Sequence, residues 1–155
     1  MNHWLMKSEP EVFGIGHLAR ARHQTSAWDG VRNFQVRNML RDQMQVDDLA
    51  FFYHSSCAVP GITGIMKISR AGHPDYTALD PENHHHDPRS TREKPIWYMV
   101  DVTLLEQFKR TLTLAEMRVD PALEGMLILR PGNRLSITPV TPKHWRHVLK
   151  LAARA

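Results

Sequence analysis

Two segments near the start of the chain each place a tryptophan beside hydrogen-bond donors and fixed charges. Their sequences are Trp4-Leu5-Met6-Lys7-Ser8-Glu9-Pro10 and Trp28-Asp29-Gly30-Val31-Arg32-Asn33. An aromatic face can stack on a planar ring while neighbouring polar groups hydrogen-bond the edge of that ring. These residue types therefore favour a pocket that accepts a nucleobase flipped out of its stack.

A second group of residues, rich in histidine, raises the question of metal binding. His84-His85-His86 precedes Asp87 in the chain. Three consecutive side chains do not readily converge on one ion, and the sequence suggests no other ligands nearby. We therefore expect neither a metal nor another cofactor.

A hydrolase or nuclease is the main alternative from a different functional class. His54, Ser55 and Cys57 could together supply a nucleophile and a base. The sequence places no second acid–base partner, and a lone cysteine is more often a small buried group. We therefore expect no enzymatic activity.

Length and composition indicate one globular domain over residues 1–155. A chain of 155 residues can bury a substantial core without disulfides, and its single cysteine rules out an internal one. The hydrophobic content of 42% argues against a disordered or fibrous chain. Because we find no apolar run of membrane-spanning length and no export leader, we expect no membrane association. A monomer in the cytoplasm, or in the nucleus of a eukaryote, is the expected form.

Positive charge is concentrated in two parts of the chain. Residues 17–41 contain five arginines and one aspartate, and residues 125–155 contain six lysines or arginines and no acidic residue. Segregated basic surface suits a polyanion such as nucleic acid. Basic helix faces that are merely solvated would give the same pattern, so charge alone does not decide. A protein-interaction module with a basic surface is a further alternative.

Residue alternation predicts five or six strands, many of them joined as hairpins. Short helices at the edges complete an α+β fold whose mixed, curled sheet approaches a barrel. The expected strands are residues 3–7, 49–54, 62–68, 96–102, 127–129 and 135–138.

Capping signals place the helices between these strands. Ser8 with Glu11, and Thr113 with Glu116, are capping-box patterns that each predict a short helix. Residues 33–42 have one apolar face and predict another. A last helix is expected after Thr141, with Trp145 in the core, and residues 71–95 are expected to form a long surface loop.

Several longer motifs match a known family. The chain closely resembles the EVE-domain family from about residue 3 to about residue 150. The resemblance implies a PUA-like fold related to the YTH domains that read methylated adenosine, and a role as a modified-base reader. The matching motifs are the two tryptophan segments, Phe51-Phe52-Tyr53-His54-Ser55, Pro60-Gly61-Ile62 and Leu129-Arg130-Pro131-Gly132-Asn133-Arg134-Leu135-Ser136.

The resemblance also implies which residues surround the base. Lys7 and Ser8 would border the pocket, and Trp28 would supply a stacking wall. Trp97 would be a candidate second wall. The remaining lining residues would come from the end of one strand and the start of its partner, namely Tyr53, His54, Ser55, Gly61 and Ile62.

Polar residues divide into those expected to recognise the base edge and those expected to hold phosphates. Ser8, Asn33 and Ser55 each offer a donor and an acceptor for the edge. The flanking phosphates of the nucleic acid would be held, without reading of sequence, by Arg20, Arg22 and Arg32. The bound partner is thus expected to be DNA or RNA carrying a modified base.

Some of these residues also have a purely structural interpretation. Trp4 begins a strand, and we expect it to anchor that strand in the core. Trp28 lies in a polar, glycine-flanked stretch, which favours the pocket. Trp97 fits either role, and Asn33 could cap the following helix as well as contact a base. A deep aromatic cavity would support a base reader. Converging acid–base groups would instead support an enzyme, and a surface without a cavity would support an interaction module.

Overall fold

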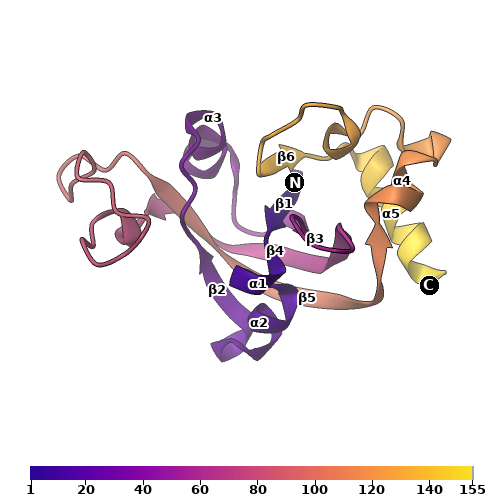
Figure 1. Cartoon of the computed structure of the whole chain (residues 1–155), viewed down its shortest axis with the longest axis horizontal. Helices are drawn as coiled ribbons and strands as arrows, with labels where there is room; N and C mark the ends of the chain where they lie inside the picture. Colours follow the sequence, from indigo (N-terminus) through magenta and orange to yellow (C-terminus); the bar gives the residue numbers. More distant parts are fainter. Residues whose placement is uncertain (155) are drawn as a thin grey trace.

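A six-stranded mixed sheet runs through the molecule, which is described for residues 1–154 by a computed structural model (Figure 1). The strand order is β2-β5-β4-β3-β1-β6, with β1 parallel to β3 and all other neighbours antiparallel. The predicted α+β class is confirmed. The sheet stays open, because β2 and β6 are its two edges. The strands are β1 (His3–Ser8), β2 (Thr25–Trp28), β3 (Leu49–His54), β4 (Gly61–Pro74), β5 (Tyr98–Thr113) and β6 (Ile137–Pro139).

Short helices flank the sheet. Two groups of segments lie at opposite ends of the long strands β4 and β5. Figure 1 shows α4 and α5 at one end of these strands and the loop between β4 and β5 at the other. None of the helices within residues 1–154 has the length and apolar character to cross a membrane. The helices are α1 (Pro10–Phe13), α2 (Ile15–Arg20), α3 (Phe34–Asn38), α4 (Leu114–Arg118) and α5 (Pro142–Ala153), with 3-10 turns η1 (Arg22–Gln24), η3 (Tyr76–Ala78), η4 (Pro121–Leu123) and η5 (Leu127–Leu129), and a π-helical turn η2 (Met39–Gln43).

Two of the predicted capping signals are confirmed. The Thr113 side chain accepts a hydrogen bond from the Glu116 backbone N–H, and the Glu116 carboxylate accepts one from the Thr113 backbone N–H. Thr141 caps α5 by accepting from the His144 N–H. Each cap satisfies a backbone donor that the first helical turn leaves free.

Three sequence predictions are wrong in detail. Residues 127–129 form the 3-10 turn η5, because the short β6 at the sheet edge pairs with β1 alone. The Ser8–Glu11 capping box does not form: Ser8 ends β1 and its hydroxyl donates to the Phe13 carbonyl instead. Strands β4 and β5 are longer than predicted, because they continue to pair with each other across several register shifts.

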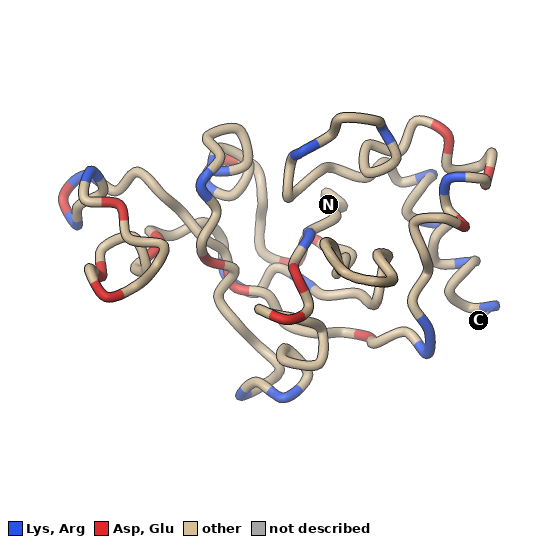
Figure 2. Tube along the Cα trace, viewed as in Figure 1, with Lys and Arg blue, Asp and Glu red and all other residues tan. Residues whose placement is uncertain are grey.

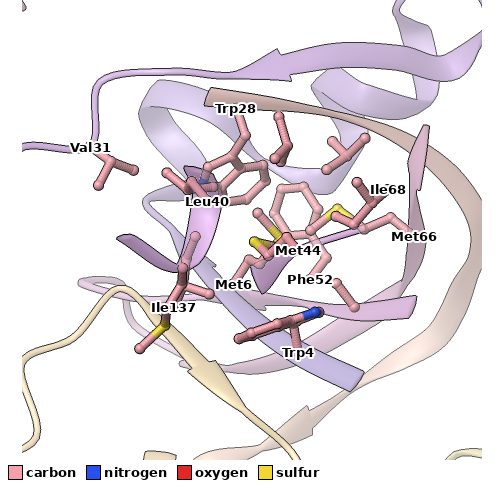
Figure 3. Close-up of a cluster of buried hydrophobic side chains, with 14 of the residues drawn as sticks. Trp4, Met6, Trp28, Val31, Leu40, Met44, Phe52, Met66, Ile68 and Ile137 are labelled. Carbon is pink, nitrogen blue, oxygen red and sulfur yellow. The ribbon is translucent and has the colours of Figure 1, made fainter. Parts of the chain in front are cut away.

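Side chains on the two faces of the sheet belong to two separate cores. Leu5 and Phe51 point into a cluster with Trp145, whose ring stacks on Phe51 at 3.9 Å. Met6 and Phe52, one position further along each strand, point into the cluster shown in Figure 3. Trp145 is therefore a core residue, as predicted, and each buried side chain of this size contributes about 1.5–3 kcal/mol.

Trp4 anchors the first strand, as predicted from the sequence. It is 2% exposed, and its indole Nε1–H donates to Asp48 Oδ2 at 3.0 Å. The buried Asp48 carboxylate also accepts from the backbone N–H groups of Asn2 and Gln45. Figure 3 shows Trp4 well separated from Trp28, with Met44 and Phe52 between them. The two tryptophans therefore do not form one aromatic site.

Replacing Trp4 with Phe should lower the free energy of unfolding by about 1–3 kcal/mol, because the buried Asp48 carboxylate loses its indole donor. Urea denaturation of Trp4→Phe, Asp48→Asn and the double variant measures the coupling between the two side chains. A coupling energy near zero would contradict the anchoring role.

Candidate functional site

A cavity of about 470 Å³ lies where β1 and β2 end. Its walls come from the end of β1, helix α1, the end of β2 with the residues that follow it, the loop between β4 and β5, and the residue before β6. Of the residues predicted to surround a base, the cavity brings together Lys7, Ser8, Trp28 and Arg32.

Trp28 forms an aromatic wall of the cavity together with Phe13. The Trp28 ring is 6% exposed and meets Phe13 at 86° and Phe52 at 75°, both edge-to-face arrangements. Edge-to-face packing fixes ring orientation and adds to the stability from burial. Trp28 is thus both part of the core cluster of Figure 3 and part of the cavity lining.

The buried carboxylate of Asp75 holds the residues after β2 in place. It accepts hydrogen bonds from the Gly30 N–H at 2.8 Å, from Arg32 Nη1 at 3.1 Å and from the Thr77 N–H at 2.8 Å. Burial alone would raise the pKa of Asp75, but the hydrogen bonds from Thr77, Gly30 and Arg32 outweigh it and lower the pKa. Asp75 therefore stays ionised at neutral pH.

Arg32 links this carboxylate to the loop between β4 and β5. Besides its bond to Asp75, it donates to the Val31 carbonyl, to Thr77 Oγ1 and, through Nε and Nη2, twice to the His85 carbonyl. All five N–H donors of the guanidinium thus have acceptors within the protein. The predicted contact of Arg32 with phosphate would require it to give up some of these bonds.

His85 closes the cavity from the loop side. Its ring lies against Gly30, which has φ +80°, and a Cβ at that position would come within 2.5 Å of the ring. Burial and the neighbouring His84 lower the pKa of His85, so its ring is neutral at pH 7. Sequence reasoning did not predict the contribution of Asn83, His84 and His85 to the cavity; the only signal was the length of the loop. Within residues 1–154, no three His, Cys, Asp or Glu side chains are grouped so as to hold a metal.

Lys7 and Asp29 are charged groups at the cavity that have no ion-pair partner in the described part of the chain. Burial lowers the pKa of the Lys7 ammonium. The pKa of the Asp29 carboxyl is raised, first by loss of water around it and then by the nearby Asp75. For Asp29 the nearby His85 and Arg32 and a backbone hydrogen bond offset these effects only in part.

Several other predicted site residues lie outside this cavity. Tyr53 and Ser55 line a neighbouring cavity of about 320 Å³, which also includes Lys7. The His54 ring accepts a hydrogen bond from the Ile15 N–H at 3.0 Å. Gly61 approaches the Leu112 carbonyl so closely that a Cβ would clash, and Ile62 is buried in the second core.

The remaining predicted residues have structural contacts or lie on the surface. Asn33 caps α3 by accepting from the Val36 N–H, the alternative role noted from the sequence. The Trp97 indole donates to Asp87 at 2.7 Å and its ring packs on Phe34, so Trp97 fastens the loop rather than lining the cavity. Arg20 and Arg22 are exposed on α2 and η1 and line neither cavity.

Comparison with known proteins assigns the chain to a family. The chain matches the EVE domain family over residues 2–151. It belongs to the EVE-domain family. Human thymocyte nuclear protein 1 is 43% identical over 166 residues, which span 97% of this chain and 73% of the human protein. The resemblance predicted from the motifs is confirmed.

Solved structures share the fold of this EVE domain over nearly its whole length. A Pseudomonas putida protein is 48% identical with a TM-score of 0.92, over 97% of this chain and 99% of that one. The human THYN1 protein, whose crystal structure is a complex with DNA containing 5-methylcytosine, is 43% identical with a TM-score of 0.90, over 98% of each chain.

Replacing Asp75 with Asn should lower the free energy of unfolding by about 3–5 kcal/mol at neutral pH, because the Arg32 guanidinium loses its buried counter-charge. The pKa of Asp75 is lowered by folding, so its contribution is present above about pH 4 and is lost as pH falls through the native pKa. Urea denaturation at pH 7 and pH 3 tests both statements.

The matched control for this prediction is Asp42→Asn. Asp42 also pairs with an arginine, Arg41, but the pair lies on the surface. We expect little change in stability from this variant at either pH. An equal loss in the two variants would mean that Asp75 has no special role.

Proposed function

We propose that this EVE domain is a nucleic-acid-binding module that takes a flipped, modified base into the cavity beside Trp28. The observation that carries the proposal is the complex of the human THYN1 protein with 5-methylcytosine DNA, at 43% identity and a TM-score of 0.90. The cavity supports it, because about 470 Å³ is within the range of small-molecule sites and its wall is aromatic. The proposed unit is the single domain of residues 1–155, acting as a monomer.

The energetics of base capture fit this cavity. Extruding a base costs a few kcal/mol, and stacking on one aromatic side chain such as Trp28 returns about 1–3 kcal/mol. A methyl group on the base adds about 0.8 kcal/mol of apolar contact. Discrimination by the methyl group alone is therefore modest, and hydrogen bonds to the base edge must supply the rest.

Asp29 and Lys7 are suited to recognise that edge. Asp29 is the one carboxylate among the residues that line the cavity, and a carboxylate accepts from an exocyclic amino group, as in cytosine N4. The Lys7 ammonium can only donate, which suits a base carbonyl. We therefore propose a base that carries both an amino group and a carbonyl. Neither Asp29 nor Lys7 forms an ion pair within residues 1–154, so a base that hydrogen-bonds to these charged groups gains affinity.

The hydrolase alternative receives no support from the hydrogen bonds. The Nε2 lone pair of His54 already accepts the Ile15 N–H, so this ring is not free to act as a base on a substrate. Among residues 1–154, no hydrogen bond joins a serine or cysteine side chain to a histidine ring. We therefore propose binding without catalysis. The interaction-module alternative is disfavoured by the presence of an aromatic-walled cavity.

The first test is a binding panel of short DNA and RNA strands with and without base modifications, 5-methylcytosine included. Trp28→Leu should weaken binding of the preferred modified strand by about tenfold or more, because it removes the stacking face and keeps apolar volume in the core. Fluorescence anisotropy gives Kd, and far-UV circular dichroism checks that the variant is folded.

Trp145→Leu is the matched control, because Trp145 lies in the other core cluster and contacts Phe51. It should lower stability without changing affinity. The proposal fails if all strands bind alike and Trp28→Leu is unimpaired. Turnover of any strand in the panel would instead favour an enzyme.

The second test concerns the base edge. Asp29→Ala should weaken binding of cytosine-type bases by about tenfold and leave uracil-type bases unaffected, because a charge-assisted hydrogen bond to the amino group is lost. Removing a negative charge can also raise affinity for any polyanion, so the ratio of the two Kd values is the measured quantity. An unchanged ratio would exclude Asp29 from base recognition.

A further inference from the structure

The second cavity, of about 320 Å³, has a different character from the first. It lies at the end of β3 and the start of α4, and the Pro131-Gly132-Asn133 turn closes one side. Its lining includes Lys7, Arg118 and Arg130 and no Asp or Glu. Lys7 lines both cavities, so the two sites meet at the end of β1.

The cations of this second cavity are not engaged elsewhere. No ion pair or side-chain hydrogen bond joins Lys7, Arg118 or Arg130 to any residue in the described part of the chain. Figure 2 shows basic residues and no acidic one along the loop that leads into β6. An anion placed in the cavity would therefore meet three cationic groups with free donors and no opposing carboxylate.

The Tyr53 hydroxyl adds a neutral donor to these three cations. Tyr53 is 2% exposed and lines the cavity, yet its hydroxyl makes no hydrogen bond to any residue between 1 and 154. Burial raises the pKa of Tyr53 to about 12, so the hydroxyl keeps its proton and remains a donor at neutral pH. Because the hydroxyl oxygen is not among the fully enclosed unpaired side-chain atoms of residues 1–154, it is accessible from the cavity and free to donate to a ligand.

The turn that closes the cavity is held in a fixed shape. The Asn133 side chain donates to the Leu127 carbonyl and accepts from the Leu135 N–H, and Gly132 has φ +77°. The exposed Arg130 side chain therefore extends from a turn whose backbone is held by hydrogen bonds. A turn backbone that is already formed lowers the entropic cost of binding an anion.

We propose that the second cavity binds the backbone phosphate of the nucleotide next to the base held beside Trp28, through Lys7, Arg118, Arg130 and the Tyr53 hydroxyl. This inference rests on the proposed function. It also reassigns the phosphate contacts expected from the sequence: the Arg32 donors are used inside the protein, and Arg20 and Arg22 line neither cavity. Phosphates are the part of a nucleic acid that fixes register on the protein.

The test compares a single-stranded oligonucleotide that contains 5-methylcytosine with the free nucleoside 5-methyldeoxycytidine, which has no phosphate. Arg118→Ala/Arg130→Ala should weaken oligonucleotide binding by about tenfold and reduce the slope of log Kd against log salt by about 1–2. Nucleoside binding should stay unchanged. Arg20→Ala/Arg22→Ala removes the same charge from the surface and should leave the slope unchanged.

Tyr53→Phe separates a ligand-binding hydroxyl from a structural one. The variant should bind the oligonucleotide several-fold more weakly while its denaturation midpoint stays the same or rises, because the hydroxyl has no partner within the protein. A lower midpoint with unchanged affinity would overturn the role of Tyr53.

The outcomes distinguish the two levels of the proposal. If the unmodified protein binds neither the oligonucleotide nor the nucleoside, the proposed function fails and this inference fails with it. If both ligands bind but the Arg118/Arg130 variant keeps the original affinity and salt slope, the phosphate site is wrong and base capture stands.

Discussion

The buried carboxylate of Asp75 is the interaction on which the cavity depends. It binds the Gly30 N–H after β2, the Arg32 guanidinium and the Thr77 N–H in η3, and Arg32 in turn binds the carbonyl of His85. Asp75 and Arg32 are more than 40 residues apart in the sequence. A buried charge is tolerated only where its hydrogen-bonding capacity is filled. The bonds that compensate the charge of Asp75 therefore also hold the segment from Trp28 to Arg32 against the loop between β4 and β5.

Strand geometry explains why one short segment serves two cavities. Because β1 and β3 are parallel, the two strands end side by side, at Ser8 and His54. Alternation along β1 sends Lys7 to the side of Leu5 and the second core, and Ser8 to the side of Met6 and the first core. Lys7 is long enough to reach the rim of both cavities, whereas Ser8 lines only one.

The sequence predicted the parts of the site that are set by local motifs, and missed those set by distant partners. The segment from Trp28 to Arg32, with Lys7 and Ser8, lines the first cavity as expected. Tyr53 lines the second cavity instead, because it lies on the same face of the sheet as Leu5. Nothing near Arg32 in the sequence indicated that Asp75 and His85 would take up its donors. The strand predicted at residues 127–129 failed for a similar reason, since an apolar run becomes a strand only where a neighbouring edge is available.

Two kinds of polar group can be separated by whether the protein satisfies them. Asp75 has its full set of donors and its pKa is lowered, which marks a group that contributes to the stability of the fold. The pKa of the Asp29 carboxyl is raised by partial loss of water and by the nearby Asp75, and the pKa of the Lys7 ammonium is lowered by burial. Neither group forms an ion pair within residues 1–154. The Tyr53 hydroxyl opens onto the second cavity and has no hydrogen-bond partner among residues 1–154. Such groups leave hydrogen-bonding capacity open to a ligand. Their position around two adjoining cavities is the physical reason to assign both cavities to one ligand that carries a base edge and a phosphate.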